Sequence, residues 1–354
     1  MKSMNSIMEL LSNQKLSEIS LFINDRCNLK CKHCYVAPGK AEADVSLQRW
    51  KDVISEAVGL GVNVLGIVGK EPLLTPEKTF ELIKFAKKIN RDMVVGFVTN
   101  GLLLPKYSKQ ISEVDPTYID ISIDGTESNH DEIRGKGNFR KTVEGIKSLL
   151  DAGFPKEKIF LSITLTSKTD AAGIIKYFNN FGIANFVISP YMLFSHTSED
   201  LSINYTERFK QLIDSELPSI GNDLDSTANI YIRAAEYPFS HLVDFFVSKK
   251  YISLDDLLED KCKNVIFNLH KIGKMNVITN FLPFSTSFIR EIRITSDGYV
   301  LNCLDQGFED YKERSIGNIK ERDLMDLLGS EKCQVRKKEL IEDSVKSITR
   351  SKPI

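Results

Sequence analysis

Strand-like and helix-like segments alternate through the first half of this 354-residue chain. Amphipathic helical patterns separate six short apolar runs rich in β-branched or aromatic residues, which predict strands. The predicted strands are Ile19–Ile23, Val62–Val68, Met93–Thr99, Tyr118–Ile123, Ile159–Leu165 and Asn185–Ser189. Strands that alternate with helices form a parallel sheet. Each helix returns the chain, by a right-handed crossover, to the edge of the sheet at which the previous strand began. We therefore predict an α/β fold, either an open barrel or a doubly wound sheet.

Composition excludes several classes of function. Hydrophobic residues make up 42% and charged residues 27%, as in ordinary globular chains. The formal net charge of −1 gives no basic field that would favour a nucleic-acid partner. No apolar run approaches the roughly 20 residues that span a membrane, and the first residues do not read as a signal peptide. We expect a cytoplasmic protein whose six cysteines serve metal binding or catalysis rather than disulfides.

Three cysteines directly follow the first predicted strand. Cys27, Cys31 and Cys34 have the spacing C-x3-C-x2-C. Iron–sulfur clusters are normally held by four cysteines, so a set of three leaves one iron open to another ligand. The alternative is a zinc site, but zinc usually takes four ligands and no second C-x2-C pair occurs in the chain. The spacing therefore predicts a cluster with an open coordination position, which indicates chemistry rather than scaffolding.

This cysteine motif resembles that of the radical S-adenosylmethionine (SAM) enzymes. In that family, three such cysteines hold a [4Fe-4S] cluster, and SAM chelates the fourth iron. An electron from the cluster cleaves SAM to a 5′-deoxyadenosyl radical, which takes a hydrogen atom from the substrate. The resemblance implies a partial (β/α)6 barrel over residues 18–192, after an N-terminal extension at 1–17. It also implies a reducing electron donor such as flavodoxin or ferredoxin.

A turn after the second predicted strand resembles the family's Gly-Gly-Glu-Pro motif. It reads Gly69-Lys70-Glu71-Pro72, with lysine in place of the second glycine. In the family, the backbone and the glutamate of this motif bind the SAM amino group. A carboxylate suits that role, because an ammonium group needs a charge-assisted acceptor. An ordinary strand–helix turn is the alternative. Lysine would cost conformational energy there if the position required positive φ.

Polar residues also follow the third and fourth predicted strands. Asn100, and Ser122 with Asp124, resemble family segments that approach SAM. Side chains at the carboxyl ends of parallel strands lie where ligands bind in this fold class. Asn-Gly and Asp-Gly are also plain turn signals, so a purely structural role is the alternative.

Four further residues complete the predicted cofactor site. Arg134 belongs to a segment that resembles the family's Arg-Gly and could pair with the SAM carboxylate in a bidentate fork, although it could equally be a surface arginine. Ser162 and Thr164 alternate with apolar residues along the fifth strand, so both hydroxyls could face the barrel interior. His33 occupies a position that packs near the adenine in the family.

The remaining chain has a different pattern. Residues 193–290 predict a helical insert or linker without further strands, with helices around Tyr205–Leu217, Phe239–Val247 and Leu254–Leu258. Residues 291–354 begin with a predicted β-hairpin, whose Asp-Gly turn separates Glu291–Thr295 from Tyr299–Leu304. A helix at about 323–328 and a charged, fraying end complete it.

This C-terminal hairpin resembles the start of the SPASM domain of many radical SAM enzymes, which implies a small α+β cap. The usual closing series of cysteines is absent: Cys333 alone follows Cys303, and Cys262 is the only other candidate. We therefore expect a degenerate SPASM-like region without a full auxiliary cluster. The alternative is that these three scattered thiols hold a second cluster together with a non-cysteine ligand, but their spacing does not indicate it. Cys303 and Cys262 are either buried small hydrophobes or thiols that return a hydrogen atom to a product radical.

The overall reaction is harder to predict from the sequence than the cofactors are. Without auxiliary clusters there is no obvious electron acceptor, so we predict a redox-neutral modification such as epimerisation, elimination or rearrangement. The expected substrate is a polar small molecule (a sugar, nucleoside or amino acid) in a biosynthetic pathway. Maturation or epimerisation of a ribosomally made peptide is the alternative. A non-catalytic iron–sulfur electron carrier or redox sensor is a hypothesis of another class, but it gives no reason for the Glu71 and Ser122/Asp124 segments.

Overall fold

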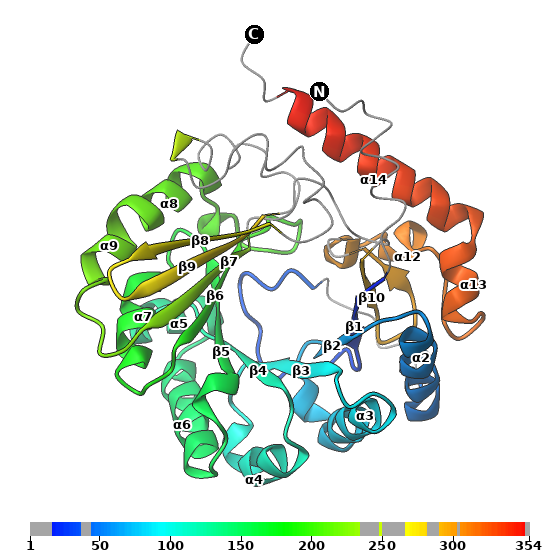
Figure 1. Cartoon of the computed structure of the whole chain (residues 1–354), viewed down its shortest axis with the longest axis horizontal. Coiled ribbons are helices and arrows are strands. Elements are labelled where there is room, and N and C mark those ends of the chain that lie inside the picture. Colours follow the sequence, from blue (N-terminus) through cyan, green and yellow to red (C-terminus); the bar gives the residue numbers. More distant parts are fainter. Residues whose placement is uncertain are drawn as a thin grey trace.

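One curved sheet organises the chain. The computed structural model describes residues 16–36, 44–233, 248–249, 266–281, 290–302 and 305–350. Its 11-stranded sheet has the order β11-β10-β1-β2-β3-β4-β5-β6-β7-β9-β8. The strands from β10 to β9 are parallel, and β11 and β8 add antiparallel edges. Figure 1 shows the strands as an arc with helices along its outer side, which is the predicted partial barrel.

The six predicted strands are all present. They are β1 (Glu18–Phe22), β2 (Val64–Val68), β3 (Val94–Thr99), β4 (Tyr118–Ser122), β5 (Ile159–Leu165) and β6 (Asn185–Pro190). The helices between them are α2 (Leu47–Gly59), α3 (Pro76–Ile89), α4 (Leu104–Val114), α5 (Glu127–Arg134), α6 (Asn138–Asp151) and α7 (Ala171–Asn179). Short 3₁₀ turns lie at Pro72–Leu74, Lys156–Lys158, Glu199–Leu201 and Asp305–Gly307.

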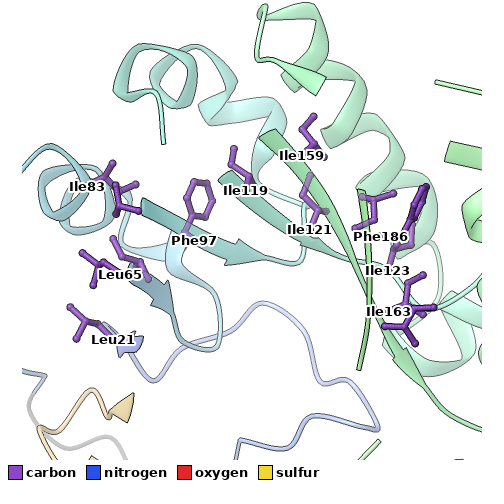
Figure 2. Packing of buried hydrophobic residues seen from close by; sticks show 14 of the residues in the cluster. Leu21, Leu65, Ile83, Phe97, Ile119, Ile121, Ile123, Ile159, Ile163 and Phe186 are labelled. Carbon is purple, nitrogen blue, oxygen red and sulfur yellow. The ribbon is translucent and has the colours of Figure 1, made fainter. Parts of the chain in front are cut away.

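The hydrophobic core lies between the sheet and the helices. Figure 2 shows Leu65, Phe97 and Ile119 on successive strands, with Ile83 of α3 in the same cluster. Alternate residues of each strand face the other way. Along β5, burial alternates residue by residue, which places Ser162 on the inner face of the arc. The inner face is therefore where polar side chains from several strands come together.

Residues 193–290 differ from the prediction. A helix does begin at Tyr205, as α8 (Tyr205–Gln211), a π-helical segment (Leu212–Glu216) and α9 (Leu217–Ile220). The expectation of no further strands is wrong, because three strands continue the sheet: β7 (Ala228–Arg233), β8 (Ile266–Ile272) and β9 (Met275–Phe281). The two helices predicted at 239–247 and 254–258 lie outside the described residues.

The predicted C-terminal hairpin is confirmed as β10 (Glu291–Ile294) and β11 (Val300–Leu301). Strand β10 also pairs in parallel with β1, so the hairpin both extends the barrel sheet and begins the C-terminal cap. Helices α12 (Tyr311–Arg314) and α13 (Leu324–Gly329) follow. The charged final stretch is helical as α14 (Glu331–Arg350), 20 residues long, and the expectation that its end frays stays a prediction. Its start is anchored because Cys333 is fully buried in the core.

In the part of the chain that the structure describes, no helix is both long and apolar enough to cross a membrane.

Candidate active site

The predicted cluster-binding cysteines lie on the loop that leaves the carboxyl end of β1. Figure 1 shows this loop running along the inner side of the strand arc. Cys27, Cys31 and Cys34 are free thiols with partly exposed side chains. Burial raises the pKa of the Cys31 thiol to about 11 and also raises that of Cys27. Without a bound metal, these two sulfurs therefore stay protonated at neutral pH, and cluster binding must displace their protons.

The chemistry of the cysteine loop fits a cubane cluster. The loop offers three thiols, and the residues around them supply nitrogen donors. In a cubane cluster each cysteine sulfur binds a different iron, so the cysteines surround the cluster. Nitrogen donors already face two of the sulfurs: Asn100 Nδ2 lies 3.9 Å from Cys27 Sγ, and Arg134 Nη1 lies 3.9 Å from Cys31 Sγ. Such donors suit sulfurs that carry negative charge.

The Gly69–Glu71 turn is bonded to the cysteine loop through its backbone. Glu71 N donates to Arg26 O at 2.9 Å, and Asn24 Nδ2 donates to Glu71 O at 3.1 Å. Gly69 has φ of 144°, and a Cβ there would lie 3.3 Å from Asn24 O. Lys70 does not adopt positive φ, so its departure from the family motif brings no such strain. The positive φ at this turn belongs to Gly69 instead.

Glu71 lies inside the protein with no exposed surface. Its carboxylate accepts hydrogen bonds from Leu73 N (3.0 Å), Thr99 Oγ1 (2.8 Å) and Asn100 N (2.9 Å). Burial raises the pKa of Glu71 to about 7, although the three donors oppose that rise. The carboxylate thus holds the end of β3 against the turn. Its contact with the SAM amino group stays a prediction.

Asn100 connects the end of β3 to the cysteine loop. Its Nδ2 donates to Asn28 Oδ1 at 2.7 Å and faces Cys27 Sγ, while its Oδ1 accepts from Leu102 N at 3.1 Å. Gly101 follows with φ of 84°. The structure therefore places Asn100 beside the cysteine loop, and its approach to SAM stays a prediction.

Asp124, Arg134 and His33 form one buried group. Asp124 Oδ2 accepts from Arg134 Nε and lies 2.9 Å from His33 Nε2. Its Oδ1 accepts from Thr164 N at 2.8 Å. Burial opposes ionisation of Asp124, yet Arg134 and His33 lower its pKa far below the usual range. Three predicted cofactor-binding residues thus bind one another, and Arg134 is buried rather than a surface arginine.

Ser122 and Ser162 are register partners on β4 and β5, on the inner face. Ser162 Oγ donates to Asp120 Oδ2 at 3.1 Å, while Asp120 Oδ1 is buried without a partner. Burial raises the pKa of Asp120, and Arg233 at the end of β7 opposes that rise. Sequence reasoning missed Asp120, although it precedes Ser122 by two residues and so shares its face. Arg233 was missed because no strand was expected there.

The candidate hydrogen-donor thiols stay predictions, because Cys262 and Cys303 lie outside the described residues. Cys333 is described, and its side chain packs in the hydrophobic core. That position favours the interpretation of Cys333 as a small apolar residue.

Comparison with known proteins identifies the family. The model of the Radical SAM superfamily matches residues 21–201, and that of the SPASM iron–sulfur cluster-binding domain matches residues 288–350. The chain belongs to the radical SAM superfamily. It is an enzyme of this family with a SPASM-like C-terminal region, and its cofactors are a [4Fe-4S] cluster and SAM.

The relatives of this radical SAM enzyme include GTP 3′,8-cyclases and mycofactocin maturases. A GTP 3′,8-cyclase of Petrotoga mobilis is 32% identical over 316 residues, covering 84% of this chain and 83% of that protein. The mycofactocin maturase MftC of Mycobacterium tuberculosis is 35% identical over 141 residues, covering 39% of this chain and 35% of the maturase. A GTP 3′,8-cyclase of Alkaliphilus oremlandii is matched over about half its length (30% identity, 49% covered).

Solved structures confirm the fold. SuiB of Streptococcus suis bound to S-adenosylmethionine has a TM-score of 0.68 and 16% sequence identity, covering 94% of this chain and 70% of SuiB. The structure of native anSMEcpe with bound AdoMet has a TM-score of 0.57 and 18% identity, covering 92% of this chain and 83% of that one. At these identities the likeness concerns the fold alone.

Proposed function

We propose that this radical SAM enzyme carries out a redox-neutral modification of a polar small molecule bound against the inner face of the barrel. When bound, the cluster and SAM supply the 5′-deoxyadenosyl radical that takes a hydrogen atom from the substrate. Cys27, Cys31 and Cys34 would hold the cluster, and Ser122 would meet SAM at the carboxyl edge of the sheet. The protein orients the substrate and excludes water from the radical.

The polar inner face is the observation that carries the choice of substrate. Tyr118, Asp120 and Ser162 share this face on β4 and β5, and Arg233 approaches closely enough to influence the pKa values of Tyr118 and Asp120. The unpartnered Asp120 Oδ1 calls for a hydrogen-bond donor from outside the protein. A substrate with hydroxyl or amino groups would provide one. The GTP 3′,8-cyclase relative, named for a nucleotide substrate, supports a polar small molecule.

The redox-neutral outcome rests on the count of cysteines. Outside the cluster loop the chain has only Cys262, Cys303 and Cys333, one fewer than the four that normally hold an auxiliary cluster. Cys333 packs in the apolar core. Without an auxiliary cluster, no evident group would accept an electron from the substrate radical. An overall redox-neutral reaction therefore fits best. A flavodoxin or ferredoxin would deliver the reducing electron in the cytoplasm.

Peptide modification is the second candidate. The maturase MftC matches about two fifths of this chain, and the fold resembles that of SuiB bound to its precursor peptide SuiA. A peptide substrate would place one side chain against Asp120 and leave the rest of the peptide outside the barrel.

The first experiment tests SAM cleavage. The enzyme is reconstituted anaerobically, reduced with dithionite and given SAM, and 5′-deoxyadenosine is measured by mass spectrometry. We expect product from the wild type and from Cys333→Ala, but none from Cys31→Ala. An intact, reduced cluster that gives no product, and whose EPR signal does not change with SAM, would instead indicate an electron carrier.

The second experiment separates the substrates. Nucleotides, sugars, amino acids and candidate peptides are compared for their ability to accelerate 5′-deoxyadenosine formation and to yield a product of unchanged oxidation level. Asp120→Asn should weaken this acceleration for the true substrate while leaving SAM cleavage without substrate unchanged. Acceleration by a peptide alone would favour the second candidate.

A further inference from the structure

We propose that Asp124 and Arg134 form a positioning pair that holds the cysteine loop and makes the reduction potential of the cluster less negative, through a hydrogen bond from Arg134 to the sulfur of Cys31. The inference needs the cluster to sit on the predicted cysteines, but it does not depend on which substrate is used. It gives both residues a role that is separate from binding SAM.

Asp124 is placed to hold the loop. It lies just beyond β4 with no exposed surface, and both of its oxygens accept hydrogen bonds from the protein. One oxygen fixes the carboxylate to the backbone of β5 at Thr164, and the other faces Arg134 and His33. Because His33 lies between Cys31 and Cys34 in sequence, its contact with Asp124 fixes the middle of the cysteine loop to the sheet.

Arg134 bridges the same carboxylate to a cluster sulfur. It is the last residue of α5 and is buried. Its Nε donates to Asp124, its Nη1 lies 3.9 Å from Cys31 Sγ, and its Nη2 lies 3.2 Å from His33 Nε2. A planar guanidinium can reach several partners at fixed angles, which a lysine cannot do.

The backbone supports this arrangement. Lys32 N donates to Ile133 O at 3.0 Å, and Ser198 N donates to Lys32 O at 2.9 Å. The end of α5 and the segment after β6 therefore hold the cysteine loop from two sides. This leaves little freedom for Cys31 to move away from the guanidinium.

The effect on the cluster has a definite sign. Reduction adds negative charge to a cluster, and part of that charge resides on its sulfurs. An N–H group pointing at a sulfur, and the positive charge behind it, stabilise the reduced form more than the oxidised form. Asp124 offsets part of the guanidinium charge, but the N–H aimed at Cys31 Sγ lies inside the protein, where the dielectric constant is lower, so its effect at the sulfur is larger than at the surface. Removing Arg134 should therefore make the potential more negative.

The test is a redox titration of the reconstituted holoenzyme, followed by EPR, without SAM or substrate. For Arg134→Gln we expect the reduction equilibrium to move at least about tenfold towards the oxidised form, or about 59 mV for one electron. Arg140→Gln is the matched control, since it removes the same charge from an arginine that is 78% exposed and paired with Glu127. Its potential should equal that of the wild type.

Two further variants complete the test. Arg134→Lys keeps the positive charge but loses the planar guanidinium that reaches several partners at once. The reduction potential of its cluster should therefore fall between those of the wild type and Arg134→Gln. It also serves as the measured variant if Arg134→Gln does not retain iron. Asp124→Asn should release iron to a chelator several-fold faster than the wild type, because Arg134 and His33 lose their ionic partner.

Unchanged potentials in Arg134→Gln and Arg134→Lys, with full iron content, would overturn the inference. A fall in SAM affinity alone would then assign Arg134 to the SAM carboxylate. An unchanged rate of iron loss in Asp124→Asn would overturn the positioning role of the carboxylate. None of these results bears on SAM cleavage, so failure of the proposed function is detected separately by the absence of 5′-deoxyadenosine.

Discussion

Arg293 of β10 donates a hydrogen bond from Nη1 to the Tyr35 hydroxyl, 2.7 Å away, and its guanidinium carbon lies 5.7 Å from the centre of the Tyr35 ring. Tyr35 directly follows the cluster cysteine Cys34, whereas Arg293 belongs to the region that matches the SPASM domain. The C-terminal region therefore contacts the cluster loop directly. This contact gives the SPASM-like region a role at the cluster loop that does not depend on a cluster of its own.

Tyr35→Phe tests this contact. Loss of a hydrogen bond to a charged donor should cost about 2 kcal/mol and loosen the loop next to Cys34. We expect the reconstituted enzyme to lose iron to a chelator several-fold faster, with SAM cleavage retained at early times. The control is Tyr177→Phe, which removes a hydroxyl from a partly exposed ring on α7. Equal rates of iron loss in both variants would show that the contact does not restrain the loop.

Glu71 should make stability depend on pH. Its pKa is raised to about 7 in the folded protein, above its ordinary value of 4.5, because burial disfavours the charged form. The folded state therefore binds more protons than the unfolded state between these values, and stability falls as pH rises through that window. The shift corresponds to about 3 kcal/mol, fully lost above about pH 7.

Urea unfolding of the reconstituted enzyme between pH 5 and pH 8 measures this effect. Glu71→Gln should remove the part of the pH dependence that Glu71 causes, so the difference in unfolding free energy between wild type and variant should change steadily with pH. Other titrating groups cancel in that difference. A constant difference across the range would show that Glu71 titrates normally.

Two glycines in register provide a matched pair of variants. Gly66 of β2 lies opposite Gly96 of β3. A Cβ at Gly96 would lie 2.5 Å from Tyr118 O, a backbone atom of β4, whereas a Cβ at Gly66 would meet only side-chain atoms, the nearest being Ser20 Oγ at 3.2 Å. We expect Gly96→Ala to lower the unfolding free energy by about 2 kcal/mol or more, and Gly66→Ala by less than about 1 kcal/mol. Equal losses in chemical denaturation would show that β3 and β4 separate easily.

The barrel strands could be predicted because each one carries its own signal. The run from Ile159 to Leu165 is apolar and β-branched, and it alternates in the way that its burial later confirms. The strand Ala228–Arg233 was missed although it carries a strand signal: Ile230, Tyr231 and Ile232 are β-branched or aromatic, and burial alternates along the segment. The polar stretch before it and the helical patterns around it favoured a helical insert instead.

The sequence indicated several residues that the structure places around the cysteine loop, but not the contacts between them, and their contacts with SAM stay predictions. Asn100 and Asp124 follow strands, and Arg134 lies in the loop or helix after the fourth strand. These positions indicated that the three residues lie near the cysteines. That Asp124 binds Arg134 and His33 depends on how α5 meets the cysteine loop in space, which no local pattern encodes. Likewise, nothing near Tyr35 in sequence indicates Arg293, which is 258 residues away.

Cys333 offers the most direct test of whether the C-terminal region holds a second cluster. Its side chain is fully buried and packs in the same core as Leu324 and Leu327 of α13. Cys333→Ala should therefore lower the unfolding free energy by about 1 kcal/mol and leave the iron content at about four per chain. Cys333→Ser should be less stable than Cys333→Ala, because it buries a hydroxyl among apolar side chains. Cys34→Ala, which removes a predicted cluster ligand, should abolish most iron binding. If the wild type held about eight irons and Cys333→Ala about four, Cys333 would be a ligand of an auxiliary cluster, and the argument for a redox-neutral reaction would lose its basis.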